Sequence, residues 1–183
     1  MSRATTSILG AVVLVAALAG CSNGPSRDAI AASANVVDST LAVTKASAQL
    51  LRNEAADRLP QIIVKDVVDT MDGSTACLDD KEDPTGIARF WSSSTTITVV
   101  NSQAARIATV TDDLTAGFVE QGWVLEGSTL VKPDSTSTIE VTVKEKADGQ
   151  RPAVHIEVVG PCVLTDGVGS DELTALEKPA TTN

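Results

Sequence analysis

A pattern of one strand, one helix and three further strands between residues 87 and 162 constrains the fold of this chain more than any other feature. Each strand-like segment alternates apolar and polar residues, which is the two-residue period of a strand with one buried face. The helix-like segment instead spaces its apolar residues three and four positions apart. The strand-like segments are residues 89–100, 123–132, 139–144 and 153–159, and the helix-like segment is 102–118.

Glycine residues mark interruptions in this pattern. Gly127 lies inside residues 123–132 and predicts a bulge or kink within one strand. Asp148 and Gly149 form a pair that is typical of a tight hairpin, which makes the last two strands antiparallel neighbours. In the last strand, Val154, Ile156 and Val158 are expected to face the core, and His155 and Glu157 to face the other way.

Residues 27–59 predict a long helix, with Ser26 placed to cap its start and Pro60 to end it. Such a helix would reach about 45 Å at about 1.5 Å per residue. It is either an extended stalk or a helix laid across the sheet, and the second is favoured because an apolar face needs burial. That face is formed by Ile30, Val37, Leu41, Ala48, Leu51, Ala55 and Leu59.

Residues 61–71 give two opposing signals. Ile63, Val67 and Met71 have helical spacing, whereas the many β-branched residues weaken helix preference. We interpret the segment as a second helix. The chain is then one α+β domain over residues 27–165, a two-layer sandwich with a helical part (27–72) and a β-α-β-β-β sheet part (87–162). Residues 166–183 are expected to form a mobile tail with a short helix at 171–177.

The first residues of the chain have a different character. Arg3 supplies a positive charge, and an apolar run over residues 8–19 ends in small residues. These are the features of a secretory signal peptide, which we assign to residues 1–20. The run is shorter than the roughly 20 apolar residues that cross a bilayer.

The sequence Leu18-Ala19-Gly20-Cys21 resembles the lipobox of bacterial lipoproteins that signal peptidase II processes. The resemblance implies that the thiol of Cys21 is diacylated, that the chain is cut before it, and that the new amino terminus is acylated. Residues 21–26 would then be a lipidated tether to the extracytoplasmic face of the cell membrane. The mature part resembles small envelope lipoproteins of actinobacteria.

This resemblance also bears on the other two cysteines. If Cys21 carries lipid, Cys77 and Cys162 are left as a pair in an oxidising compartment, where disulfides form and persist. A metal site would need more ligands than two cysteines and a single histidine supply. We therefore expect a disulfide that joins the segment entering the sheet to the end of the sheet, and no metal or cofactor.

Charge and aromatic content narrow the function classes. The formal net charge is −10, so phosphate backbones are repelled and nucleic acid is not an expected partner. The chain holds two phenylalanines, two tryptophans and no tyrosine, which disfavours sugar platforms and base-stacking surfaces.

Candidate catalytic and metal-ligating residues are few. His155 is the only histidine, and no Gly-x-Ser-x-Gly or Ser-x-x-Lys motif accompanies it, so we interpret it as a surface residue. Asp79, Asp80, Glu82 and Asp83 lack the alternate spacing of a calcium loop and are interpreted as a solvated loop. The chain is not expected to be an enzyme.

Phe90 and Trp91 are adjacent strand residues that face opposite ways, so one of them can lie outside the main core. That residue either packs under the first helix, which is favoured, or lines a partner or ligand surface, which makes Phe90 and Trp91 the candidate interaction surface. The sequence thus favours a non-enzymatic binding or assembly module that meets an envelope partner through its sheet face or first helix. One alternative is a carrier that holds a lipid or other apolar ligand between helices and sheet. A hydrolase of envelope polymers ranks last.

Overall fold

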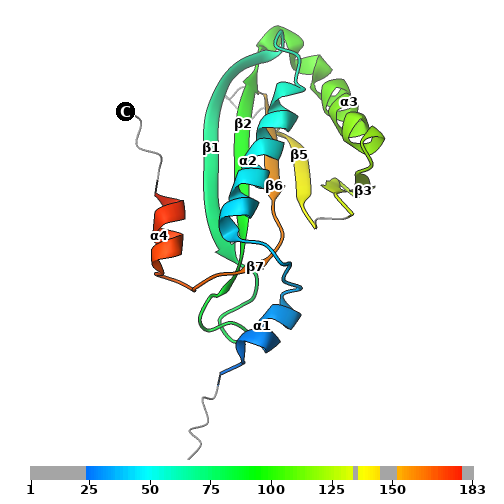
Figure 1. Cartoon of the computed structure of the whole chain (residues 1–183). Coiled ribbons are helices and arrows are strands. Elements are labelled where there is room, and N and C mark those ends of the chain that lie inside the picture. Colours follow the sequence, from blue (N-terminus) through cyan, green and yellow to red (C-terminus); the bar gives the residue numbers. More distant parts are fainter. Residues whose placement is uncertain (1–23, 134–135, 145–151, 179–183) are drawn as a thin grey trace, which may run out of the picture.

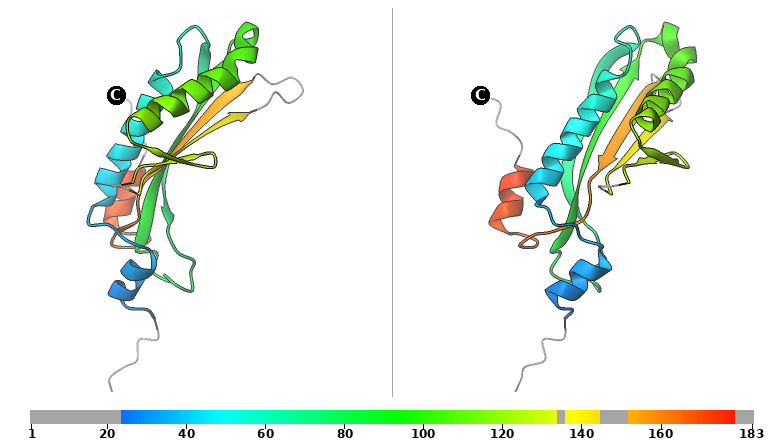
Figure 2. Two further views of the ribbon diagram at one scale, coloured as in Figure 1. Left: turned by 90° about the vertical axis from the view of Figure 1, so that its right-hand side faces the viewer. Right: turned by 45° about the vertical axis from the view of Figure 1, so that its right-hand side comes forward.

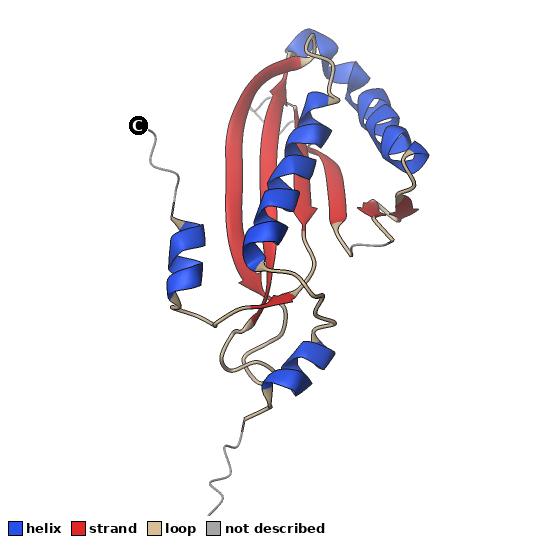
Figure 3. Ribbon diagram, viewed as in Figure 1, coloured by secondary structure: helices blue, strands red, loops and turns tan. Residues whose placement is uncertain are grey.

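The computed structural model describes residues 24–133, 136–144 and 152–178. Within them the expected α+β sandwich is confirmed: helices form one layer and an antiparallel sheet forms the other (Figure 1, Figure 3). The helices are α1 (Arg27–Ser33), α2 (Leu41–Asp57), α3 (Ile107–Glu120) and α4 (Asp171–Glu177), and a 3₁₀ helix at Asn101–Arg106 precedes α3.

The sheet of the described residues has seven strands, ordered β1-β2-β6-β5-β4-β3, with β7 pairing beside β2. Figures 1 and 2 show that α2 and α3 lie on the same side of these strands. One face of the sheet is therefore covered and the other is open. The strands are β1 (Val64–Ala76), β2 (Ala88–Val99), β3 (Val124–Glu126), β4 (Thr129–Val131), β5 (Thr138–Lys144), β6 (Ala153–Val159) and β7 (Val163–Leu164).

The single long helix predicted over residues 27–59 is wrong, because the chain forms two helices there. Asn35 adopts a left-handed conformation (φ 49°) after α1, and Thr40 caps α2 by accepting a hydrogen bond from the Val43 N–H at 3.3 Å. Of the two interpretations, burial of the apolar face is confirmed. Leu41, Ala48 and Ala55 of α2 are fully buried against the sheet.

The second helix predicted at residues 61–71 is also wrong, because residues 64–71 form the first part of β1. It pairs antiparallel with β2, and the pairing extends from Val64 to Ala76. The β-branched residues of this segment favour a strand, and pairing with β2 stabilises the strand over a helix. The helical spacing was misleading because Val67 and Met71, which lie on an edge strand, are 59% and 62% exposed.

The glycine at position 127 also acts differently from the prediction. Gly127 does not kink a single strand; it takes a positive φ of 64° in the turn between β3 and β4. A left-handed residue closes a tight hairpin, and glycine adopts that conformation without strain. The strands β5 and β6 are antiparallel neighbours as expected, while Asp148 and Gly149 lie outside the described residues.

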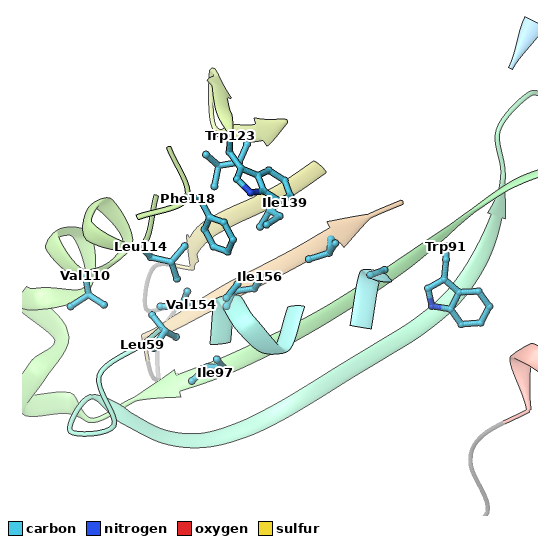
Figure 4. Close-up of a cluster of buried hydrophobic side chains, with 14 of the residues drawn as sticks. Leu59, Trp91, Ile97, Val110, Leu114, Phe118, Trp123, Ile139, Val154 and Ile156 are labelled. Carbon is cyan, nitrogen blue, oxygen red and sulfur yellow. The ribbon is translucent and has the colours of Figure 1, made fainter. Parts of the chain in front are cut away.

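The core lies between the helices and the covered face of the sheet (Figure 4). Val154, Ile156 and Val158 are fully buried, as predicted for the last strand. Phe118 of α3 and Trp123 pack edge to face, with ring centroids 5.4 Å apart. Ile107, Val110, Leu114 and Phe118, which are spaced three and four positions apart along α3, are buried.

The Cys77–Cys162 disulfide is present and closes a sequence separation of 85 residues. It lies at the end of the molecule that carries α1. There the Val37 N–H donates to the Cys162 carbonyl at 3.0 Å, and Ile30 is buried in a small apolar cluster with Ile87. These contacts connect α1 and the residues that follow it to the segments at this end of the sheet.

The structure describes residues 166–178 of the tail that is predicted to be mobile. The short helix expected at 171–177 is α4, and it packs against the domain. Leu173 is buried, the Lys45 Nζ donates to the Leu176 carbonyl, and the Ser74 hydroxyl donates to Glu177. The remainder of the predicted tail lies outside the described residues.

The predicted signal peptide and Cys21 also lie outside the described residues. In the ranges that the structure does describe, none of the helices combines the length and the apolar character needed to cross a membrane.

Candidate functional site

A groove of about 440 Å³ lies on the open face of the sheet, across β1, β2 and β6. This volume falls within the roughly 300–1,000 Å³ that ligand pockets usually occupy. We call it the open-face groove. The side chains and the glycine that define it are Met71, Gly73 and Thr75 from β1, Phe90, Ser92 and Ser94 from β2, and His155 and Glu157 from β6.

Strand register brings these residues together. In the pairing of β1 with β2, Gly73 lies opposite Ser92, and Thr75 lies opposite Phe90. In the pairing of β2 with β6, Ser94 lies opposite Glu157. Successive side chains of a strand point to opposite faces, so these alternate residues share the face away from the helices.

A row of polar side chains crosses the floor of the open-face groove. The Ser92 hydroxyl donates a hydrogen bond to Glu157 Oε1 at 3.0 Å. His155 Nδ1 and the Thr96 hydroxyl form a hydrogen bond of 2.9 Å, and His155 Nε2 lies 3.9 Å from Glu157 Oε2. These contacts hold the imidazole and the carboxylate in fixed positions, and the His155 side chain is 22% exposed.

The row has the residue types of a nucleophile, a base and an orienting acid, but its geometry suits binding better than acyl transfer. The 3.9 Å between His155 and Glu157 exceeds the length of a hydrogen bond. Strands β2 and β6 each have a neighbouring strand on both sides, so their backbone N–H groups donate hydrogen bonds within the sheet. Free N–H groups that could stabilise an oxyanion are therefore not supplied by these two strands.

The structure separates Phe90 from Trp91. Phe90 lies on the open face and lines the groove, whereas Trp91 is fully buried on the helix side. The Trp91 indole N–H points to Asp72 Oδ1 at 3.4 Å, and Lys45 Nζ lies 4.6 Å from the ring centroid. Opposite orientation of the pair is confirmed, but Trp91 as part of an exposed interaction surface is wrong.

A polar contact beneath the groove fixes the strands that form it. Arg52 of α2 donates from Nη1 to Asp72 Oδ2 at 3.1 Å and to the Ser93 hydroxyl at 2.9 Å. Asp72 and Ser93 are opposite each other in the register of β1 and β2. This bridge was missed from the sequence, because it requires residues 64–76 to be a strand.

The acidic loop is only partly the solvated loop expected from the sequence. Asp79 caps a turn by accepting from the Lys81 N–H at 2.8 Å, whereas Asp83 is 2% exposed. Burial by itself raises the pKa of the Asp83 carboxyl. Hydrogen bonds from the Ala88 N–H, the Thr85 hydroxyl and neighbouring backbone N–H groups outweigh burial and lower this pKa below its ordinary value.

The described ranges also bear on two other kinds of site, a metal centre and an apolar cavity. No group of three or more histidine, cysteine, aspartate or glutamate side chains is placed to hold a metal ion there. A pocket of about 350 Å³ lies between α2 and β1, but Arg52, Asn53 and Asp57 contribute to its lining. Such a lining does not suit the apolar ligand of a carrier.

Of the two residues of the candidate interaction surface, the structure thus places Phe90 in one groove with His155 and Glu157, and it buries Trp91 on the other face of the sheet. Sequence reasoning missed Gly73 and Met71, although the outward orientation of His155 and Glu157 was a signal for this face. Comparison with protein-family models, with curated proteins and with solved structures gives no match to this chain.

Proposed function

We propose that this chain is a lipid-anchored protein of the cell envelope that binds a partner through the open-face groove and catalyses no reaction. The observation that carries the proposal is the groove itself, which is concave and lies on a sheet face that none of the described helices covers. It combines an apolar end at Phe90 with fixed polar groups at His155 and Glu157. A few placed polar groups beside apolar surface are typical of binding sites.

The fold also suits an anchor at Cys21. Cys21 lies three positions before Gly24, where the described chain begins, and three residue steps span at most about 11 Å. The end of the molecule that carries α1 would therefore lie next to the membrane. That end is held together by the disulfide and by the contact of Arg27 Nη1 with the Thr165 carbonyl at 3.2 Å.

Gly73 offers a direct test of the groove. A Cβ added there meets no atom within 4 Å, so we expect Gly73→Val to occupy the groove and leave the fold of the free protein intact. Wild-type chain, Gly73→Val and the control Thr129→Val would be immobilised and exposed to a detergent extract of the envelope. Thr129 also lies on the open face, but on β4, away from the groove.

The proposal expects an envelope component that wild type and Thr129→Val retain and that Gly73→Val does not. Retention by all three variants alike would show that binding does not use the open-face groove. Unfolding curves of each variant ensure that the comparison is made between folded proteins.

A further inference from the structure

We infer that the open-face groove binds an extended polypeptide segment of a partner protein, with a lysine or arginine side chain placed over Glu157. This inference rests on the proposed function, because it names the chemical class of the ligand for the same groove. Its observations are a like-charge pair at one end of the groove, a missing side chain in its wall and an apolar surface at its other end.

The like-charge pair is formed by Glu157 and Glu140. They lie directly opposite each other in the antiparallel pairing of β5 and β6, on the open face. Directly opposite residues have Cβ atoms about 4.5–5.5 Å apart, and like charges at such positions destabilise a sheet. Among the described side chains, the only basic group within 4 Å of Glu157 is His155. A cation from a ligand would relieve this repulsion.

The missing side chain is that of Gly73. It faces Ser92 across the β1–β2 pair, and the space where its Cβ would lie is empty to 4 Å. Glycine within a strand weakens the strand, and it often marks a place where another backbone approaches closely. The groove follows β1 from Met71 to Thr75, a length of about 13 Å, which matches about four residues of an extended chain.

The apolar end of the groove is formed by Phe90, which lies opposite Thr75, whereas Met71 lies at the other end, opposite Ser94. Met71 is 62% exposed, although it is a large apolar side chain. Alternate side chains of an extended ligand point the same way, so one apolar and one basic side chain can contact the two ends of the groove together. Phe90 and the β2 residue opposite Glu157, Ser94, are four positions apart, also about 13 Å.

The net charge of the chain and the aromatic content of the groove argue against nucleic acid, an anionic lipid surface or a sugar as the ligand. A net charge of −10 repels nucleic acid and anionic lipid surfaces, whereas it attracts a basic peptide. Phe90 is the single aromatic side chain of the groove lining, which is little for stacking a sugar.

The test uses the oxidised chain from residue 22 onward, which contains every described element. The probe is an array of hexapeptides, Xaa-Thr-Xaa-Thr-Xaa-Thr, with the three variable positions drawn from arginine, glutamine, glutamate, valine and phenylalanine. Each spot is probed with wild type, Glu157→Gln, Gly73→Val and Glu120→Gln. Glu120 is exposed at the end of α3, so its variant loses the same charge away from the groove.

For wild type, we expect peptides that pair one arginine with one apolar residue to bind about tenfold more tightly than their glutamine analogues. Glu120→Gln should retain this preference, Glu157→Gln should reduce it to about twofold, and Gly73→Val should abolish binding. A preference that Glu157→Gln and Glu120→Gln weaken equally would overturn the inference, since it would reflect net charge alone.

Two further outcomes separate this inference from the proposed function. If no peptide binds, while Gly73→Val still loses the component retained from the envelope extract, the groove binds something other than a basic polypeptide. The inference is then wrong and the proposed function stands. If Gly73→Val binds the peptides as wild type does, both are wrong, because the groove is not the binding surface.

Discussion

Gly73 of β1 lies directly opposite Ser92 of β2, and the Ser92 hydroxyl holds Glu157 of β6 by a hydrogen bond of 3.0 Å. The empty space at Gly73, in the wall of the groove, thus lies near the Glu157 carboxylate, which the hydrogen bond from Ser92 holds in place. The three residues come from three neighbouring strands, on the face of the sheet that the described helices leave open. This relationship makes the groove a feature of strand register, and not of loop conformation.

Filling the groove should not destabilise the protein. Gly73→Val adds a β-branched side chain where no atom lies within 4 Å of the new Cβ, and valine loses less conformational freedom in a strand than glycine does. We expect the free energy of unfolding to stay the same or to rise by about 0.5–1 kcal/mol. Urea unfolding measures it, and a clear loss of stability would mean that the space at Gly73 is not open.

Phe90 and Trp91 should behave in opposite ways, because the structure puts them on opposite faces of β2. Trp91→Ala removes a fully buried ring and should lower the free energy of unfolding by about 3–5 kcal/mol. Phe90→Ala should change stability much less but should weaken ligand binding at the groove. Thermal unfolding, followed by retention of the envelope component, distinguishes the two; equal losses of stability would contradict the assignment of faces.

Removal of the disulfide should be costly. Cys77→Ser combined with Cys162→Ser opens a loop with a sequence separation of 85 residues. In the chain-entropy model, closing a loop of this length stabilises the folded state by about 4–5 kcal/mol. Reduction of the wild-type protein with dithiothreitol should give a loss similar to that of the double variant. If neither treatment shifts the urea midpoint, the bond has no stabilising role.

Stability should depend on Asp83 below about pH 5. The pKa of this carboxyl is lower in the folded state, where hydrogen bonds from Ala88 and Thr85 outweigh burial, than in the unfolded chain. A group with a depressed folded pKa stabilises at pH values above its unfolded pKa, and that contribution is lost as the pH falls through the folded pKa.

The corresponding variant is Asp83→Asn, which should lose stability at pH 7 and show a shallower decline between about pH 5 and pH 3 than wild type. Asp80→Asn is the control, because Asp80 is an exposed residue of the same loop. Identical pH profiles of the free energy of unfolding for wild type and Asp83→Asn would show that Asp83 does not contribute to the loss of stability in acid.

Membrane attachment should depend on Cys21. Cys21→Ser removes the thiol that the lipobox resemblance assigns to lipid, so the chain should remain unprocessed or be released into the medium. Fractionation followed by immunoblotting measures where the chain is located, and mass spectrometry of the amino terminus shows whether it has been cut. A Cys21→Ser chain that is cut before residue 21 and still membrane-bound would refute the lipid anchor.

The sequence allowed the sheet to be predicted where its period is clean. The alternation of Val154, Ile156 and Val158 with polar neighbours identified both the strand and its buried face. The pairing of Cys77 with Cys162 followed from elimination once Cys21 was assigned to lipid. Local signals were sufficient in these places because local preference and tertiary packing agree.

The prediction failed where tertiary pairing overruled local spacing. Ile63, Val67 and Met71 have helical spacing, yet β2 recruits this segment as an edge strand. An edge strand exposes apolar residues that a helix would have buried. The helical spacing of the apolar residues in this segment therefore does not mark a buried face. The groove depends on this strand, so Gly73 and Met71 could not be recognised as site residues before β1 was known.

The central claim is that a partner contacts the open-face groove, and site-specific photo-crosslinking in the cell tests it most directly. A benzoylphenylalanine residue would replace Met71 in the groove or, as a control, Val43, which is 56% exposed on α2. We predict a discrete crosslinked adduct from position 71 and none from position 43. An adduct from position 43 with none from position 71 would contradict the account, because the partner would then bind the helical layer.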